Sequence, residues 1–185
     1  MTQVLPAPFG IENADPYDVQ YKQAIGNATH RAIHLDVRSD LNEETVDVEV
    51  WPYLRGWRQF VADTGYRSVL SHERLYSELY EYSGELDAVG ILNGRIIVPD
   101  FKCCAAKPGP IVGLQLAAYA QLLRENFKGQ PIADVRRRFA LWFTPERAPG
   151  YVLVPFDKPS DWPDFLSYLN VWKFETANGL RRAAA

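Results

Sequence analysis

The chain has 185 residues, of which 47% are hydrophobic and 23% charged, as is usual for a globular protein that can bury a sizeable core. It has no apolar run of roughly 18 residues and no signal-peptide pattern at its N-terminus, so we expect an intracellular, cytoplasmic protein without a membrane-spanning helix. The net charge of −3 and the isoelectric point near 5.6 count against tight, non-specific binding to nucleic acid.

The spacing of apolar residues predicts four helices, over residues 16–37, 43–62, 111–127 and 161–177. Asp15-Pro16 is typical of a cap and first turn, and Pro52 is expected to divide or kink the second helix. Strands are predicted over residues 66–80, where a bulge is allowed, in a hairpin over 85–102, and over 136–143 and 151–156. This order predicts an α/β or α+β fold, a sheet with helices on both faces.

The hairpin over residues 85–102 is the most informative stretch. Asn93-Gly94 is the strongest short-range hairpin signal, because both central positions of a type I′ turn need a positive φ. A two-residue turn at this place pairs Leu92 with Arg95. Both faces of the hairpin carry apolar residues, which predicts burial on both sides: Val89, Ile91, Ile96 and Val98 on one face, and Leu86, Ala88, Leu92, Ile97 and Phe101 on the other.

The same register places charged residues opposite one another. Asp87 is predicted to lie across from Asp100, and Glu85 across from Lys102. Two facing carboxylates repel each other unless a cation lies between them, and a divalent metal ion with oxygen ligands is suited to that position. A lysine on the same face can hold a nucleophilic water or stabilise a developing negative charge.

Four short motifs occur in a characteristic order. They are Gly26–His30 (G-x-x-x-H), Asp87 in residues 84–87, Asp100-Phe101-Lys102, and Gln115–Tyr119 (Q-x-x-x-Y). No motif is specific alone, but together, on the predicted helices and strands, they resemble the PD-(D/E)XK nuclease superfamily and its RecB-like exonuclease branch. The resemblance covers residues 17–175, and the core reads Asp-Phe-Lys-Cys where many relatives have Asp-Tyr-Lys-Thr.

The resemblance implies a restriction-endonuclease-like fold, a central mixed β-sheet flanked by helices. We expect a single nuclease domain over residues 1–185, with an extended lead-in over 1–16, an N-terminal helical part over 17–65 and a catalytic core over 66–177. The implied cofactor is Mg²⁺ or Mn²⁺. An iron–sulfur cluster is not expected, because the chain has only two cysteines and such clusters use four ligands.

The resemblance also implies roles for individual residues. The metal ligands would be His30, Asp87, Asp100 and the carbonyl of Phe101. Lys102 would orient the attacking water, and Gln115 and Tyr119, which share a helix face, would support the lysine and the substrate phosphate. Glu73 matches an acidic position used by some relatives, Glu85 could pair with Lys102, and His34 is expected to be a bystander one turn after His30.

The expected partner is DNA, as single strands or duplex ends, in recombination, repair or phage DNA processing by a bacterial or phage-encoded enzyme. A structure-specific endonuclease, a non-cleaving nucleic-acid-binding protein of the same fold, and a metal-binding protein without a nucleic-acid role remain alternatives. The polarity of cleavage, DNA against RNA and the oligomeric state stay open. Arg136-Arg137-Arg138 and Arg181-Arg182 are basic runs in this acidic chain.

Overall fold

The computed structural model describes residues 4–5 and 15–180, so most of the predicted lead-in and the Arg181-Arg182 pair lie outside the described residues. In chain order the elements are α1 (Pro16–Val37), the short 3-10 helix η1 (Glu43–Thr45), α2 (Trp51–Thr64), β1 (Arg67–Ser77), β2 (Tyr82–Leu92), β3 (Arg95–Lys102), α3 (Ile111–Asn126), the 3-10 helix η2 (Pro131–Ala133), β4 (Val135–Phe143), β5 (Tyr151–Pro155) and α4 (Asp161–Ala177). None of the described helices is long and apolar enough to cross a membrane.

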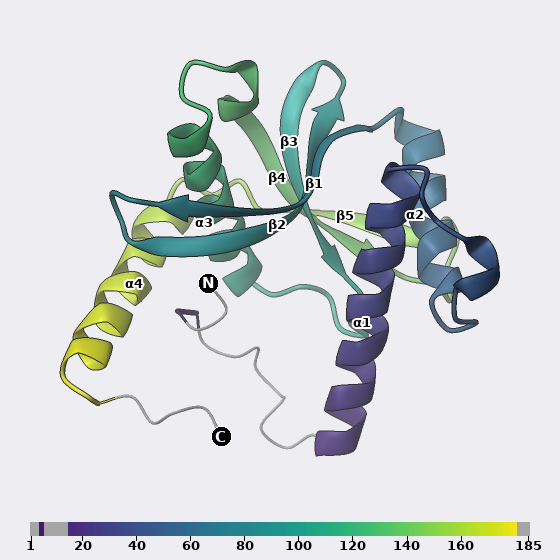
Figure 1. The fold of residues 1–185 in the computed structure, drawn as a ribbon, viewed down its shortest axis with the longest axis horizontal. Helices are drawn as coiled ribbons and strands as arrows, with labels where there is room; N and C mark the ends of the chain where they lie inside the picture. Colours follow the sequence, from purple (N-terminus) through teal and green to yellow (C-terminus); the bar gives the residue numbers. More distant parts are fainter. Residues whose placement is uncertain (1–3, 6–14, 181–185) are drawn as a thin grey trace.

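The strands form one mixed sheet in the order β1-β2-β3-β4-β5. All neighbours are antiparallel except β3 and β4, which are parallel and joined through α3. Such a parallel connection requires a long crossover, usually a helix. In Figure 1, α1 and α2 lie on one side of the sheet, and α3 and α4 lie on the other. The predicted fold class, a mixed sheet flanked by helices, is confirmed.

Local signals in the sequence placed several helix ends correctly. Helices α1 and α4 cover the predicted residues, and the Asp15 side chain caps α1 by accepting a hydrogen bond from the Tyr17 N–H at 2.7 Å. The predicted second helix was wrong in its first half. The chain forms η1 and then begins α2 at Trp51, with Pro52 in the first turn, where the missing N–H of proline costs nothing.

The Asn93-Gly94 turn is confirmed. Asn93 and Gly94 have φ values of 50° and 73°, and Leu92 pairs with Arg95. The register between β1 and β2 shifts between Ser68 and Leu70, which is the bulge that the sequence allowed.

Strand β2 bends, and this bend changes the predicted register. It pairs with β1 along its length, but with β3 only over Gly90–Leu92. In Figure 1 its first half crosses beside α3 and its second half turns along β3. The prediction that Asp87 lies in the ladder opposite Asp100 was therefore wrong, because the two strands separate before they reach these residues. Leu86 likewise packs on the α3 side with Val89, not on the face of Ala88.

Two apolar clusters cover the two faces of the sheet. One joins β2, β3 and β4 to α3 and α4, and has Leu116, Leu122 and Phe165 among its fully buried members. The other joins the sheet to α1 and α2 through Ile33, Phe60 and other aromatic rings. The predicted burial of the hairpin on both sides is confirmed, so charged groups that this region carries must find partners inside the protein.

Gly90 is required by close packing at the turn of the bent strand. A Cβ atom at this position would lie 2.4 Å from two ring atoms of Tyr66 and 2.5 Å from the Arg67 carbonyl oxygen. We expect Gly90→Ala to lower the free energy of unfolding by about 1–3 kcal/mol, as overpacking does. Gly26→Ala is the control, since a Cβ there meets nothing within 4 Å and should stabilise α1 by roughly 0.5–1 kcal/mol. Urea denaturation measures the free energy of unfolding of both variants. Equal changes in the two variants would contradict the prediction.

Candidate active site

Helix α1 is held against α2 by packing and by hydrogen bonds. Ile33 is fully buried, and the Asp36 carboxylate accepts hydrogen bonds from Trp57 Nε1 at 3.1 Å and from Arg58 Nη2 at 2.6 Å. Because α1 is held at this end, His30, two turns earlier on the helix, faces the point where β2 leaves β3.

His30 bridges the two strands at that point. Its Nδ1 lies 3.1 Å from Asp87 Oδ1, and its Nε2 lies 3.1 Å from the carbonyl oxygen of Phe101. Asp87 Oδ2 in turn accepts a hydrogen bond from the Phe101 N–H at 2.6 Å. Asp87 is therefore connected to β3 through the backbone of Phe101 and not by facing Asp100.

The protonation of His30 follows from these contacts. Burial lowers the pKa of His30, but the Asp87 carboxylate outweighs burial and raises the pKa to about 10. An imidazolium donates from both ring nitrogens, which matches the two acceptors that surround it. Burial acts to raise the pKa of Asp87, yet the charges of His30 and Lys102 and the Phe101 N–H together bring this pKa below its usual value.

Asp100 and Lys102 form a second charged pair beside the first. Lys102 Nζ lies 2.5 Å from Asp100 Oδ2, and Asp100 is only 1% exposed. Burial raises the pKa of Asp100, an effect that the nearby Asp87 carboxylate reinforces. Burial alone would lower the pKa of Lys102, but the Asp100 carboxylate raises it above its usual value. Apart from this ion pair, the buried Oδ2 accepts no hydrogen bond of regular geometry within the described residues.

Gln115 and Tyr119 approach this cluster from α3. The Gln115 amide donates a hydrogen bond of 2.8 Å to the Tyr119 hydroxyl, as the i, i+4 spacing predicts. Burial raises the pKa of Tyr119, and the Asp100 and Asp87 carboxylates raise it further. The structure thus brings together the side chains of all four motifs, from α1, β2, β3 and α3.

Gly84 lets the tyrosine reach that position. A Cβ atom on Gly84 would lie 2.8 Å from Cε1 of Tyr119 and 3.0 Å from a methyl group of Leu122. The sequence prediction used Gly84 only as part of a motif and missed this role. The signal was present as a glycine inside a strand, which often marks a close approach of another group.

The two additional glutamates are not part of the charged cluster. Glu85 forms ion pairs with Arg74 at 2.8 Å and with His72 at 2.9 Å, so its predicted pairing with Lys102 was wrong. The reason is again the bend of β2, which leaves Glu85 beside β1. Among the described residues, the Glu73 side chain has no ion pair or hydrogen bond, and its suggested role stays a prediction.

His34 also lies apart from His30. Its Nδ1 is 3.0 Å from the hydroxyl of Ser71, and its ring lies 5.4 Å from that of His72. It touches β1, whereas His30 touches β2 and β3.

Comparisons with known proteins give a structural likeness only. Neither a known protein family nor a curated protein matches this sequence. Among solved structures, the chain is similar to one described as a "putative exonuclease" from Eubacterium rectale, with a TM-score of 0.55 and 10% sequence identity. The match covers 85% of this chain and 69% of that one. The chain therefore shares the fold of that protein. At this identity the likeness shows the fold alone.

Proposed function

We propose that the protein is a divalent-metal-dependent nuclease that hydrolyses DNA phosphodiester bonds, with an exonuclease mode on DNA ends or single strands. The observation that carries the proposal is the convergence of Asp87, Asp100 and Lys102 with His30 in one largely buried cluster. Burying two carboxylates, a histidine and a lysine together is costly, and titratable groups with shifted pKa values concentrate at functional sites. The likeness to the "putative exonuclease" supports the same class of reaction.

The donor groups fit Mg²⁺ or Mn²⁺. Two carboxylates, the Phe101 carbonyl and one imidazole provide the hard oxygen and nitrogen ligands that these ions prefer, and Asp100 Oδ2 is a buried acceptor without a well-directed donor. Among the described residues, no three His, Cys, Asp or Glu side chains already form a ready-made ion site. The His30–Asp87, His30–Phe101 and Lys102–Asp100 contacts use these groups now, so an ion must displace one of them, and His30 must lose a ring proton to become a ligand. A bound ion would supply a water of lowered pKa.

Lys102 is the residue that we assign to the attacking water and to the charge that develops on the phosphate. Its ammonium is held by Asp100, and its side chain is 26% exposed, so the residue is accessible from outside the protein. An oriented ammonium in a site of low dielectric stabilises negative charge more strongly than water does.

The reaction is tested by digestion of end-labelled single-stranded and duplex DNA and of a covalently closed circle, in Mg²⁺, Mn²⁺ or EDTA. Loss of linear DNA with metal, with the circle intact, would support the exonuclease. Cleavage of the circle would indicate an endonuclease in place of the exonuclease. Intact DNA under all these conditions would overturn the proposal and leave a binding role for the cluster.

Tyr119→Phe tests the supporting role of α3. The change removes the hydroxyl that accepts from Gln115 and that lies near the two carboxylates, without removing the buried ring. We expect kcat to fall about tenfold, while the free energy of unfolding changes by roughly 1 kcal/mol or less. Tyr168→Phe, on the exposed side of α4, is the matched control. An unchanged kcat in Tyr119→Phe would show that the Tyr119 hydroxyl has no role in the reaction.

A further inference from the structure

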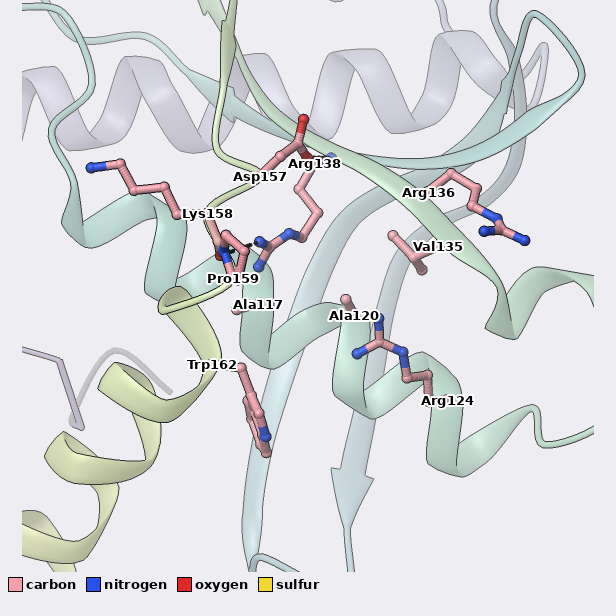
Figure 2. Close-up of a pocket in the computed structure, with 10 residues that line it drawn as sticks. All are labelled: Ala117, Ala120, Arg124, Val135, Arg136, Arg138, Asp157, Lys158, Pro159 and Trp162. Atoms are coloured by element: carbon pink, nitrogen blue, oxygen red, sulfur yellow. Dashed lines mark hydrogen bonds between the residues drawn. The ribbon is translucent and has the colours of Figure 1, made fainter.

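A pocket of about 240 Å³ lies between α3, the start of β4 and the beginning of α4 (Figure 2). Four basic side chains and one acidic side chain line it: Arg124, Arg136, Arg138, Lys158 and Asp157. This is a concentration of positive charge in a protein whose formal net charge is −3.

The pocket is separate from the charged cluster on β2 and β3. With 3.6 residues per turn, Arg124 lies roughly 140° around α3 from Tyr119. Ala117 and Ala120, which form the floor of the pocket on the helix, are also turned away from the Gln115–Tyr119 pair. Their short side chains leave the space that larger residues would fill.

Arg138 is the fixed cation of the pocket. Its side chain is 14% exposed and donates hydrogen bonds to Asp161 Oδ2 at 3.1 Å and to the Lys158 carbonyl oxygen at 3.2 Å. Burial lowers the pKa of Arg138 overall; the carboxylates of Asp161 and Asp157 act against burial, and the neighbouring Arg124 guanidinium acts with it. The protein therefore holds one guanidinium largely out of water with a second one close by.

The positive charge is only partly compensated. Arg136 is paired with Asp134 at 2.7 Å and Arg138 with Asp161 at 3.1 Å, whereas Arg124 and Lys158 have no acidic partner within the part of the chain that the structure describes. In Figure 2 the guanidinium groups of Arg124 and Arg138 lie near the alanines of α3, while Arg136 and Lys158 extend outward at the rim. Arg124 and Arg138 are therefore the pair that an anion would meet inside the pocket.

We propose that this pocket binds a phosphate group between Arg124 and Arg138. Planar guanidinium groups bind phosphate oxygens through paired hydrogen bonds, and the double charge of a phosphate relieves the repulsion between two of them. The pocket is smaller than the roughly 300–1,000 Å³ typical for larger ligands, which fits a single phosphate and not a whole dinucleotide. The group can come from free phosphate or from the backbone of a nucleic acid strand.

The test is calorimetric titration of the full chain with inorganic phosphate and, separately, with a short single-stranded oligonucleotide. EDTA is present throughout, so that cleavage is suppressed and the result does not depend on the proposed nuclease activity. Sodium chloride at the same ionic strength separates specific binding from screening. We expect saturable phosphate binding that Arg124→Gln weakens by roughly tenfold or more and that Arg124→Lys partly restores.

Arg55→Gln is the matched control, because Arg55 is an exposed arginine on α2, outside the pocket. Its phosphate affinity should equal that of the unaltered protein. If phosphate and the oligonucleotide compete, and Arg124→Gln weakens the binding of both, the bound phosphate group belongs to the backbone of the strand. Phosphate binding without such competition would identify the free anion. No phosphate binding at millimolar concentration, or equal binding by Arg124→Gln, would overturn the proposal.

Discussion

Lys102→Met should reduce the cleavage rate on linear DNA by roughly 10²–10³-fold, because it removes the only ammonium beside Asp87 and Asp100 among the described residues. Methionine keeps the length and the apolar part of the side chain. The change also removes the partner of the buried Asp100 carboxylate, so circular dichroism and the free energy of unfolding are measured beside the rate. The measurement is a single-turnover rate with saturating Mg²⁺ or Mn²⁺.

Lys128→Met is the control for this change. Lys128 is an exposed lysine just after α3, and no ion pair involves it within the described residues. Its rate should equal that of the unaltered protein. If Lys102→Met cleaved at the normal rate while its circular dichroism was unchanged, the assignment of Lys102 to the reacting phosphate would be wrong.

Asp100→Asn should abolish stabilisation of the protein by Mn²⁺. A ligand that binds only the folded state, present at a concentration of a hundred times its Kd, adds about 2.7 kcal/mol to the free energy of unfolding. Removing a buried carboxylate takes away a charged ligand, so most of this gain should be lost. The readout is the difference in Tm with and without Mn²⁺ for each protein, which separates metal binding from any effect of the substitution on the metal-free fold.

Asp40→Asn is the matched control, since Asp40 is exposed and pairs only with Arg38 within the described residues. It should retain the full shift in Tm. A normal shift in Asp100→Asn would place the ion elsewhere. No shift in the unaltered protein with either metal would contradict the proposed cofactor without reference to DNA cleavage.

Local chemistry explains which parts of the fold could be predicted. The cap at Asp15, Pro16 in the first turn of α1 and the Asn93-Gly94 turn act on the backbone within a few residues, so their effects do not depend on the rest of the chain. Pro52 was expected to divide or kink a helix although it begins one, because proline occurs both at kinks and in the first turn, and only the first turn accommodates its missing N–H at no cost.

The geometry of the charged cluster could be predicted only in part. The motif residues were found, but their contacts depend on the bend of β2, which is determined by packing against α3 and β1 and not by the turn.

The same limit applies to the arginine run. Arg138 lines the pocket against α3, whereas Arg137 lies outside it, 3.8 Å from Asp157, and no pattern in Arg136-Arg137-Arg138 shows that difference.

The parallel pairing of β3 with β4 also determines when during synthesis the charged cluster can form. His30 and Phe101 meet across 71 positions of the chain, and β3 gains its second neighbour only when β4 follows α3. Contacts between distant residues close late in folding. A nascent chain that ends before Val135 therefore carries Asp87, Asp100 and Lys102 on an incomplete sheet. The proposed DNA cleavage activity should accordingly appear only after β4 has been synthesised and has paired with β3.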